Sequence, residues 1–294
     1  MHGDHTPLAE RRQWITSVAT CRTIRYNNAM LTLEELTGQL REKSHAIVPF
    51  SLRHADFQQA IDRFVRFLAL PLPEKEQVYY NMDLGDDRGA DIGYQRRLRS
   101  EGKIDNREFF HYHPIAEEKF SAASHQHPEL RELLDAARRI YNESKQTMSD
   151  VLRAFDASYP GLHARFFPEH TEPNFCVRFL KYDMATPGEF LAKGHYDRGG
   201  CTLALAESAP GLRIGIDDLH LRDVIHDEGK ALFMPGLSFP EFTNGDIPPT
   251  WHDVVQKGED AYSPDIARWA IVFFADTYIK PKTTWEDRHR PQRI

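Results

Sequence analysis

The sequence predicts an α+β or mainly β protein in which helices flank a β sandwich or jelly roll. Apolar residues recur at helical spacing in the first half of the chain, whereas short runs of strand-forming residues follow one another after Pro173. No linker-like segment divides the 294 residues. We therefore expect one domain over 1–294, with an N-terminal α/β portion over about 1–120, a central helix over about 128–155 and a jelly-roll core over about 173–280.

The N-terminal portion alternates two helical patterns with a short strand. Residues 31–43 place leucines on one helical face, residues 45–52 form an apolar run, and residues 56–70 repeat apolar side chains at helical spacing. Pro71 and Pro73 end the second helix. No Gly-rich phosphate loop follows any predicted strand, so a nucleotide-binding fold is not expected.

The next segment, 81–104, is polar and contains glycine, Tyr94 and the basic residues Arg96, Arg97 and Arg99. It is typical of a surface loop or of a lid over a pocket. Residues 107–114 then predict a strand with His111 and His113 on one face. Since no carboxylate lies suitably near in sequence, this pair is a weak candidate for a metal site.

The second half begins with a long amphipathic pattern over 128–155, whose apolar stripe is typical of a helix packed on a core. Six short strands follow, at 175–183, 190–197, 201–207, 211–216, 230–236 and 268–276. Several short strands at this spacing favour a sandwich or jelly roll.

Composition bounds the function. The chain is 40% hydrophobic and 28% charged, with a mean hydropathy of -0.58, and it has no apolar stretch long enough to cross a membrane. A net charge of -7 and a pI near 6.1 argue against general nucleic-acid binding. The first residues lack a secretory signal, so we expect a cytoplasmic protein with three reduced cysteines. The oligomeric state is not predicted.

A His-x-Asp step occurs three times, beginning at His2, His54 and His195. The first copy lies near the terminus. The second precedes a helical pattern, where Asp56 fits a helix cap or a first-turn acid. The third copy ends the predicted strand over 190–197, between the predicted strands over 175–183 and 201–207, so we take His195 and Asp197 as the candidate metal ligands.

A distant histidine, His252, can complete a set of two imidazoles and one carboxylate that leaves three positions open. That arrangement favours a non-heme ferrous oxygenase. The same donors also suit catalytic zinc, which leaves a zinc hydrolase as an alternative. Arg268, in the strand after the distal histidine, adds an anion-binding group and favours a keto-acid enzyme.

Along most of its length the chain resembles the isopenicillin N synthase-like family of Fe(II)/2-oxoglutarate-dependent dioxygenases. The segment FVRFLALPLPEKEQ resembles the end of the family's N-terminal helix, and GYQRR and DNREFF resemble its glycine-tyrosine loop and the strand that follows. HYDRGGCTLAL and FTNGDIPPTWHDV are similar to the segments that carry its iron ligands.

This resemblance implies a distorted double-stranded β-helix with ferrous iron held by His195, Asp197 and His252. It also implies that Arg268 and Tyr182 bind the distal carboxylate of 2-oxoglutarate. The implied reaction consumes O2, hydroxylates a small-molecule metabolite and releases succinate and CO2. Two departures bear on 2-oxoglutarate binding. The family's Arg-x-Ser is replaced by an alanine at Ala270, and the interval from His252 to Arg268 is longer than usual.

Other functions remain open. An oxidase of the same family would need iron and O2 without 2-oxoglutarate, and desaturation or ring closure would use the same ligands. A non-catalytic binding protein on this scaffold is an alternative of another class. For the substrate pocket the candidates are Tyr94 and Arg97, with Phe110 and Phe239 as apolar walls and the arginines at 96–99 as a site for a carboxylate or phosphate.

Overall fold

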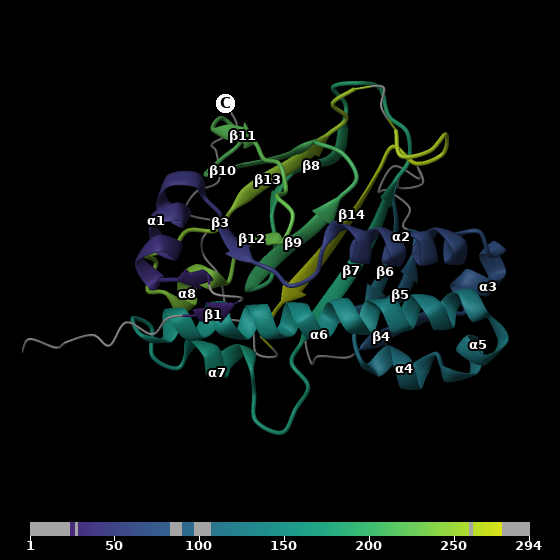
Figure 1. Cartoon of the computed structure of the whole chain (residues 1–294), viewed down its shortest axis with the longest axis horizontal. Coiled ribbons are helices and arrows are strands. Elements are labelled where there is room, and N and C mark those ends of the chain that lie inside the picture. Colours follow the sequence, from purple (N-terminus) through teal and green to yellow (C-terminus); the bar gives the residue numbers. More distant parts are fainter. Residues whose placement is uncertain (1–23, 27–28, 83–89, 97–106, 259–260, 278–294) are drawn as a thin grey trace, which may run out of the picture.

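The structure is a computed structural model that describes residues 24–26, 29–82, 90–96, 107–258 and 261–277. Three layers follow one another, with helices on one face of an eight-stranded sheet and a four-stranded sheet on the other (Figure 1). The helices are α1 (Leu33–Lys43), α2 (His54–Leu68), α3 (Leu72–Glu76), α4 (Ile115–Lys119), α5 (Ser121–Gln126), α6 (Pro128–Asp156), α7 (Leu162–Phe166) and α8 (Phe239–Phe242).

All strand pairs in the described part of the chain are antiparallel. The larger sheet has the order β3 (Ala46–Pro49), β12 (Lys230–Pro235), β9 (Cys201–Glu207), β14 (Arg268–Ala275), β7 (Phe175–Tyr182), β6 (Arg107–Tyr112), β5 (Ala90–Gln95) and β4 (Tyr79–Met82). The smaller sheet has the order β11 (Leu221–Asp223), β10 (Leu212–Gly215), β13 (Trp251–Val255) and β8 (Phe190–Tyr196). β1 (Ile24–Tyr26) and β2 (Ala29–Leu31) form a separate pair.

The helices begin where local chemistry favours a start. Thr32 and Glu35 form a reciprocal capping box at the first turn of α1. At α2, the Asp56 carboxylate accepts a hydrogen bond from the backbone N–H of Arg53 at 2.9 Å. The second His-x-Asp copy therefore supplies a first-turn acid, as expected.

Strand alternation divides the apolar side chains between two cores. On β14, Trp269, Ile271 and Phe273 belong to the core between the larger sheet and the helices, over which α6 runs (Figure 1). Ala270 belongs to a smaller core between the two sheets, with Val272 packed against it. The functional cavity lies in this second space because the first is filled by aromatic side chains.

The structure confirms the jelly-roll core with flanking helices, the long helix α6 and the six strands predicted after Pro173. It also confirms the strands predicted over 45–52 and 107–114, which are β3 and β6. One interpretation was wrong. The segment 81–104 contributes parts of the paired strands β4 and β5, because Tyr79–Met82 aligns with Ala90–Gly93. Residues 83–89 and 97–106, which include Arg97 and Arg99, lie outside the described residues.

Two further observations concern the chain as a whole. Among the described residues, no helix has the length and apolar character that a membrane span requires. Cys176 and Cys201 are free thiols, and burial raises the pKa of both. Cys21 lies outside the described residues.

Candidate metal centre and pocket

Strand register brings the two histidines together. β13 pairs with β8 so that His252 lies directly opposite His195, and Trp251 lies opposite Tyr196. Asp197 follows β8 two residues after His195, so an extended chain presents it on the same face. Residues far apart in the sequence therefore meet on one surface between the two sheets.

The ligand atoms converge. Oδ1 of Asp197 lies 3.8 Å from Nε2 of His195 and 3.9 Å from Nε2 of His252. The ligand atoms of the three residues all lie within 4.8 Å of one another, and no other such group of His, Cys, Asp or Glu occurs among the described residues. A small inward movement would let them share one cation at bond lengths of about 2.0–2.2 Å.

Hydrogen bonds to backbone carbonyls set the imidazole tautomers. Nδ1 of His195 lies 2.8 Å from the Lys193 oxygen, and Nδ1 of His252 lies 3.5 Å from the Thr250 oxygen. A carbonyl only accepts, so each Nδ1 carries the proton and each Nε2 keeps a lone pair. This is the tautomer in which Nε2 binds a metal.

The Asp197 carboxylate is also fixed from behind. The Thr202 hydroxyl donates to its Oδ2 at 2.7 Å, which leaves Oδ1 toward the histidines. The Asp197 carbonyl accepts from the backbone N–H of Leu237 at 2.8 Å. The backbone at 236 lies so close to this loop that only glycine fits, because a Cβ there would lie 2.3 Å from the Gly199 oxygen.

The protonation states suit a cation. Burial lowers the pKa of His195, and His252 lowers it further. Burial acts to raise the pKa of Asp197, but the two imidazoles and the Thr202 hydroxyl outweigh it and leave that pKa below its ordinary value. At neutral pH the centre thus offers an unprotonated imidazole at His195 and an ionised carboxylate, the forms that bind metals. The His195 side chain is 46% exposed, so the centre is reached from its side.

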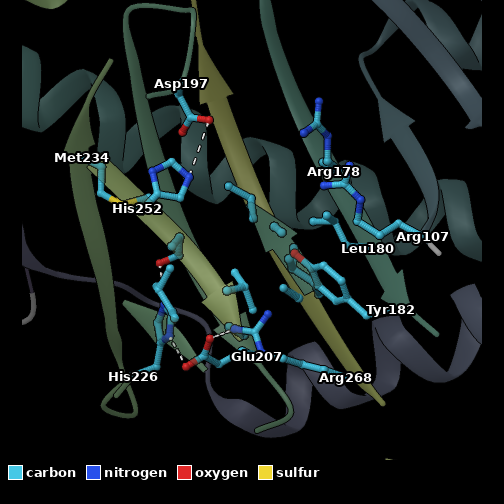
Figure 2. A pocket seen from close by; sticks show the side chains of 18 of the residues that line it. Arg107, Arg178, Leu180, Tyr182, Asp197, Glu207, His226, Met234, His252 and Arg268 are labelled. Carbon is cyan, nitrogen blue, oxygen red and sulfur yellow. Dashed lines mark hydrogen bonds and ion pairs between the residues drawn. The ribbon is translucent and has the colours of Figure 1, made fainter. Parts of the chain in front are cut away.

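The centre lines a pocket of about 610 Å³, open mouth included, between the two sheets. Figure 2 shows Asp197 and His252 at one end and Arg268 at the other. Apolar side chains from both sheets form much of the wall between them, including Leu180, Ala204, Met234, Val254 and Val272. Apolar walls with a few polar groups at the ends are typical of a small-molecule site.

Arg268 is already paired. Its guanidinium forms an ion pair with Glu207, and its Nε donates to the Ala209 carbonyl at 3.0 Å. The side chains of Arg268 and Glu207 are only 4% and 6% exposed. The Tyr182 ring lies 5.5 Å from the guanidinium, so the two residues predicted to bind a carboxylate do lie together. In this structure a carboxylate of the chain itself fills that position.

Glu207 has a second neighbour at this end of the pocket. Nδ1 of His226 lies 3.3 Å from Glu207 Oε1, but the geometry is not that of a hydrogen bond. The His226 Nε2–H donates to the Ala204 carbonyl at 3.0 Å. Burial lowers the pKa of His226, and in its neutral form Nδ1 turns a lone pair toward Glu207, so the contact is neither a hydrogen bond nor an ion pair.

Three residues predicted to line the substrate pocket do not line it. Phe110 packs against Phe67 in the helix-side core, because on β6 it alternates with the pocket-facing Arg107. Phe239 is fully buried against Phe155. The Tyr94 hydroxyl donates to buried Glu108 at 2.7 Å and serves an internal polar network. Arg97 lies outside the described residues.

The other residues singled out in the sequence have structural partners. The side chain of Arg96 pairs with Asp183 at 3.2 Å. His113 accepts from the backbone N–H of Ile115 and contacts the Pro173 carbonyl, so it serves the fold. His111 contacts the Asp91 carbonyl and does not share a metal-like cluster with His113 within the described chain.

Sequence reasoning missed four charged or titratable residues that line the pocket, namely Arg107, Arg178, Glu207 and His226. A signal for Arg178 was present. In FCVRFLKY it has the same strand parity as Leu180 and Tyr182, so a strand that turns Tyr182 into the pocket also turns Arg178 there. His226 lies in a loop and had no such signal.

Comparison with known proteins gives a fold-level result. No family model and no curated protein matches the sequence. A full-length Neurospora crassa protein solved in complex with alpha-KG has a TM-score of 0.62 and 17% identity, covering 83% of this chain and 80% of that one. A Caulobacter crescentus protein described as a member of the 2OG-Fe(II) oxygenase family has a TM-score of 0.63 and 21% identity. The similarity covers 83% of this chain and 81% of that one.

A third solved structure, JOX2 in complex with 2OG, Fe and JA, has a TM-score of 0.62 and 16% identity, covering 83% of this chain and 71% of that one. Each of the three similarities thus extends over most of the chain. The chain therefore has the double-stranded β-helix fold of the 2-oxoglutarate and Fe(II)-dependent oxygenases, with a His-Asp-His group that fits an iron site.

Proposed function

We propose that this protein is a non-heme Fe(II)- and 2-oxoglutarate-dependent oxygenase that hydroxylates a small molecule. The observation that carries the proposal is the convergence of Nε2 of His195, Nε2 of His252 and Oδ1 of Asp197 inside the pocket. Two neutral imidazoles and one carboxylate with open positions form the donor set of ferrous oxygenases. The similar solved structures that hold alpha-KG or Fe support the same assignment.

The chain's own groups then divide the work. His195, Asp197 and His252 would hold the iron, and the apolar walls exclude water from the reacting atoms. Iron bound there supplies O2 chemistry, in which one oxygen atom enters a substrate C–H bond and the other enters succinate as 2-oxoglutarate loses CO2. The backbone contacts that fix both imidazoles keep the centre oriented throughout.

Arg268 and Tyr182 would orient the keto acid through its distal carboxylate. Glu207 already pairs with Nη2 of Arg268, so 2-oxoglutarate would compete with Glu207 for the guanidinium. Binding of 2-oxoglutarate is thus an exchange of one carboxylate for another. The exchange retains the ion pair at Arg268 and moves Glu207 away from the guanidinium.

Anaerobic titration tests the proposal. We expect the ferrous protein to develop a weak visible charge-transfer band when 2-oxoglutarate is added, and to lose it in Arg268→Ala. Arg66→Ala is a matched control, since Arg66 lies on α2, is largely exposed and pairs with Glu132. Iron binding without a band in the wild type would contradict the use of 2-oxoglutarate. Failure to bind ferrous iron would contradict the oxygenase assignment.

A specific observation favours a second candidate, an oxidase of this fold that needs iron and O2 but no keto acid. Glu207 already neutralises Arg268, and Ala270 offers no hydroxyl to a carboxylate. Succinate formation separates the two functions. Substrate-dependent O2 consumption without succinate, in protein supplied with 2-oxoglutarate, would favour the oxidase.

A further inference from the structure

The pocket contains a second arginine that forms no ion pair within the described part of the chain. Arg178 lies on β7, and among the described residues no carboxylate is within ion-pair distance of it. Its guanidinium instead lies 4.4 Å from the Phe274 ring and 5.4 Å from the Phe109 ring. The Asp197 carboxylate acts on it from beyond ion-pair distance. A buried cation that lies between aromatic faces and contacts no carboxylate favours an anionic ligand.

The orientation of Arg178 is set from behind. Its Nε donates to Nε2 of His111 at 2.7 Å. Because arginine only donates, His111 must accept there and carry its own proton on Nδ1, which lies 2.8 Å from the Asp91 carbonyl. This contact uses Nε and leaves the two terminal nitrogens as an end-on fork. Such a fork matches the two oxygens of a carboxylate.

Position within the pocket separates Arg178 from the site of the keto acid. Figure 2 shows Arg178 and Arg107 across the pocket from Asp197 and His252, while Arg268 and Glu207 lie at the far end. The Arg107 guanidinium lies 5.3 Å from the same Phe109 ring that Arg178 contacts, so the two cations flank one aromatic side chain. Both guanidinium groups thus lie on the wall that faces the metal ligands.

Apolar side chains line much of the pocket near these two arginines. Leu180, Val272 and Phe274 line the same wall, and Met234 and Val254 lie in the wall of the same cavity. A ligand that satisfies both features has one anionic group on a hydrocarbon or aromatic body. A phosphate, with more oxygens and a higher charge, would need more donors than a single fork provides.

The geometry points to Arg178 as the residue that binds the substrate, and to a small carboxylic acid with an apolar body as the substrate class. This inference rests on the proposed oxygenase function. Arg178 pairs with the carboxylate, Arg107 adds positive charge, and the apolar body extends toward the metal centre, where a C–H bond is oxidised. Two arginines then serve two different carboxylates, Arg268 that of the keto acid and Arg178 that of the substrate.

Binding of defined probes tests this inference without turnover. Phenylacetate and hexanoate, with phenylacetamide and hexanamide as uncharged matches, are titrated anaerobically into the ferrous full-length protein by calorimetry. We expect at least one acid to bind, its amide not to bind, and Arg178→Gln to weaken the acid about 10- to 100-fold, as the loss of a charge-assisted pair predicts. Arg66→Gln, an exposed helix arginine, is the control.

The outcomes are separable. Acid binding that is unchanged in Arg178→Gln, or absent in the wild type, overturns the inference. Loss of the 2-oxoglutarate band in Arg178→Gln also overturns it, since Arg178 would then hold the keto acid. If the wild type shows no band but binds the acid through Arg178, the proposed function fails while the carboxylate site stands. If Arg178→Gln does not fold, Arg178→Lys replaces it, because lysine keeps the charge but lacks the two-nitrogen fork. Weaker binding of the acid by Arg178→Lys supports the inference, and unchanged binding overturns it.

Discussion

The two ends of the pocket treat their polar groups in opposite ways. At the metal end, the lone pairs of His195 and His252 and one oxygen of Asp197 point at one another without a proton between them. At the far end, the guanidinium of Arg268 forms an ion pair with Glu207 and donates a hydrogen bond to the Ala209 carbonyl. The ligand atoms of the metal end need a bound cation as their partner, whereas the guanidinium at the far end is already paired within the protein.

This difference suggests how the fold tolerates buried charge. Buried polar groups are stable when they are paired, and an unpaired one destabilises the folded chain. Glu207 keeps Arg268 paired whenever a ligand carboxylate is absent. At the metal end, no lysine or arginine of the described chain forms an ion pair with Asp197, so we expect a bound cation to stabilise this end. We therefore expect substitutions at the two ends to differ in their effects.

The largest effect is expected at the metal end. Asp197→Ala removes the only charged ligand of the group, so we expect the affinity for ferrous iron to fall by more than about 100-fold. Loss of a residue that only hydrogen-bonds to a ligand typically costs about 10- to 100-fold. Anaerobic calorimetry with ferrous iron measures this. His220→Ala is the control, because His220 pairs with Asp217 in an exposed turn. Unchanged iron affinity in Asp197→Ala would remove the distinction between the two ends.

The next largest effect is expected at the far end of the pocket, where Arg268 pairs with Glu207. Arg268→Met leaves Glu207 buried without its partner, so we expect the free energy of unfolding to fall by about 3–5 kcal/mol. Replacing both residues, as Arg268→Met with Glu207→Leu, should restore most of that stability because no unpaired charge remains. Urea denaturation of the single and double variants measures the coupling. If the losses of unfolding free energy from the two substitutions simply add in the double variant, Arg268 and Glu207 do not stabilise the fold as a pair.

A smaller effect concerns exchange at Arg268. Glu207→Gln removes the internal competitor but keeps the shape of the side chain, so we expect 2-oxoglutarate to bind about 10-fold more tightly, which corresponds to about 1.4 kcal/mol. The anaerobic charge-transfer titration gives the dissociation constant. Weaker keto-acid binding in this variant would mean that Glu207 assists the ligand.

The smallest effect concerns His113, a buried histidine that, like Arg268, the fold satisfies by itself. Burial lowers the pKa of His113 from 6.5. Below pH 6.5 the unfolded chain therefore takes up a proton that the folded chain resists, and the free energy of unfolding falls as pH decreases. The slope from this residue is at most about 1.4 kcal/mol per pH unit.

His113→Asn should reduce that slope, since asparagine can still accept from the backbone N–H of Ile115 but does not titrate. Urea denaturation of both proteins between pH 7.5 and 5.5, on the order of one unit either side of the ordinary histidine value, measures it. An identical pH dependence in the two would show that His113 is not kept neutral by burial. The other buried histidines are common to both proteins and cancel in the difference.

Much of the fold followed from periodicity in the sequence. Helical spacing located α1, α2 and α6, and runs of strand-forming residues located β3, β6 and the six strands predicted after Pro173. The misassigned strands, β4 and β5, carry polar residues and glycine in a pattern that local propensity assigns to a loop. Their pairing with each other, and of β5 with β6, supplies the stability that their own sequence lacks.

The sequence by itself determined the donor types, because the His195-x-Asp197 step and the distant His252 supply two imidazoles and a carboxylate. Only the tertiary structure decided which strand face meets the cavity, and this excluded Phe110 and Phe239 and admitted Arg178. Tertiary structure also decided that Glu207 closes Arg268. Spacing along one strand fixes the side of a residue relative to its neighbours, whereas contacts between distant strands depend on a register that no single segment encodes.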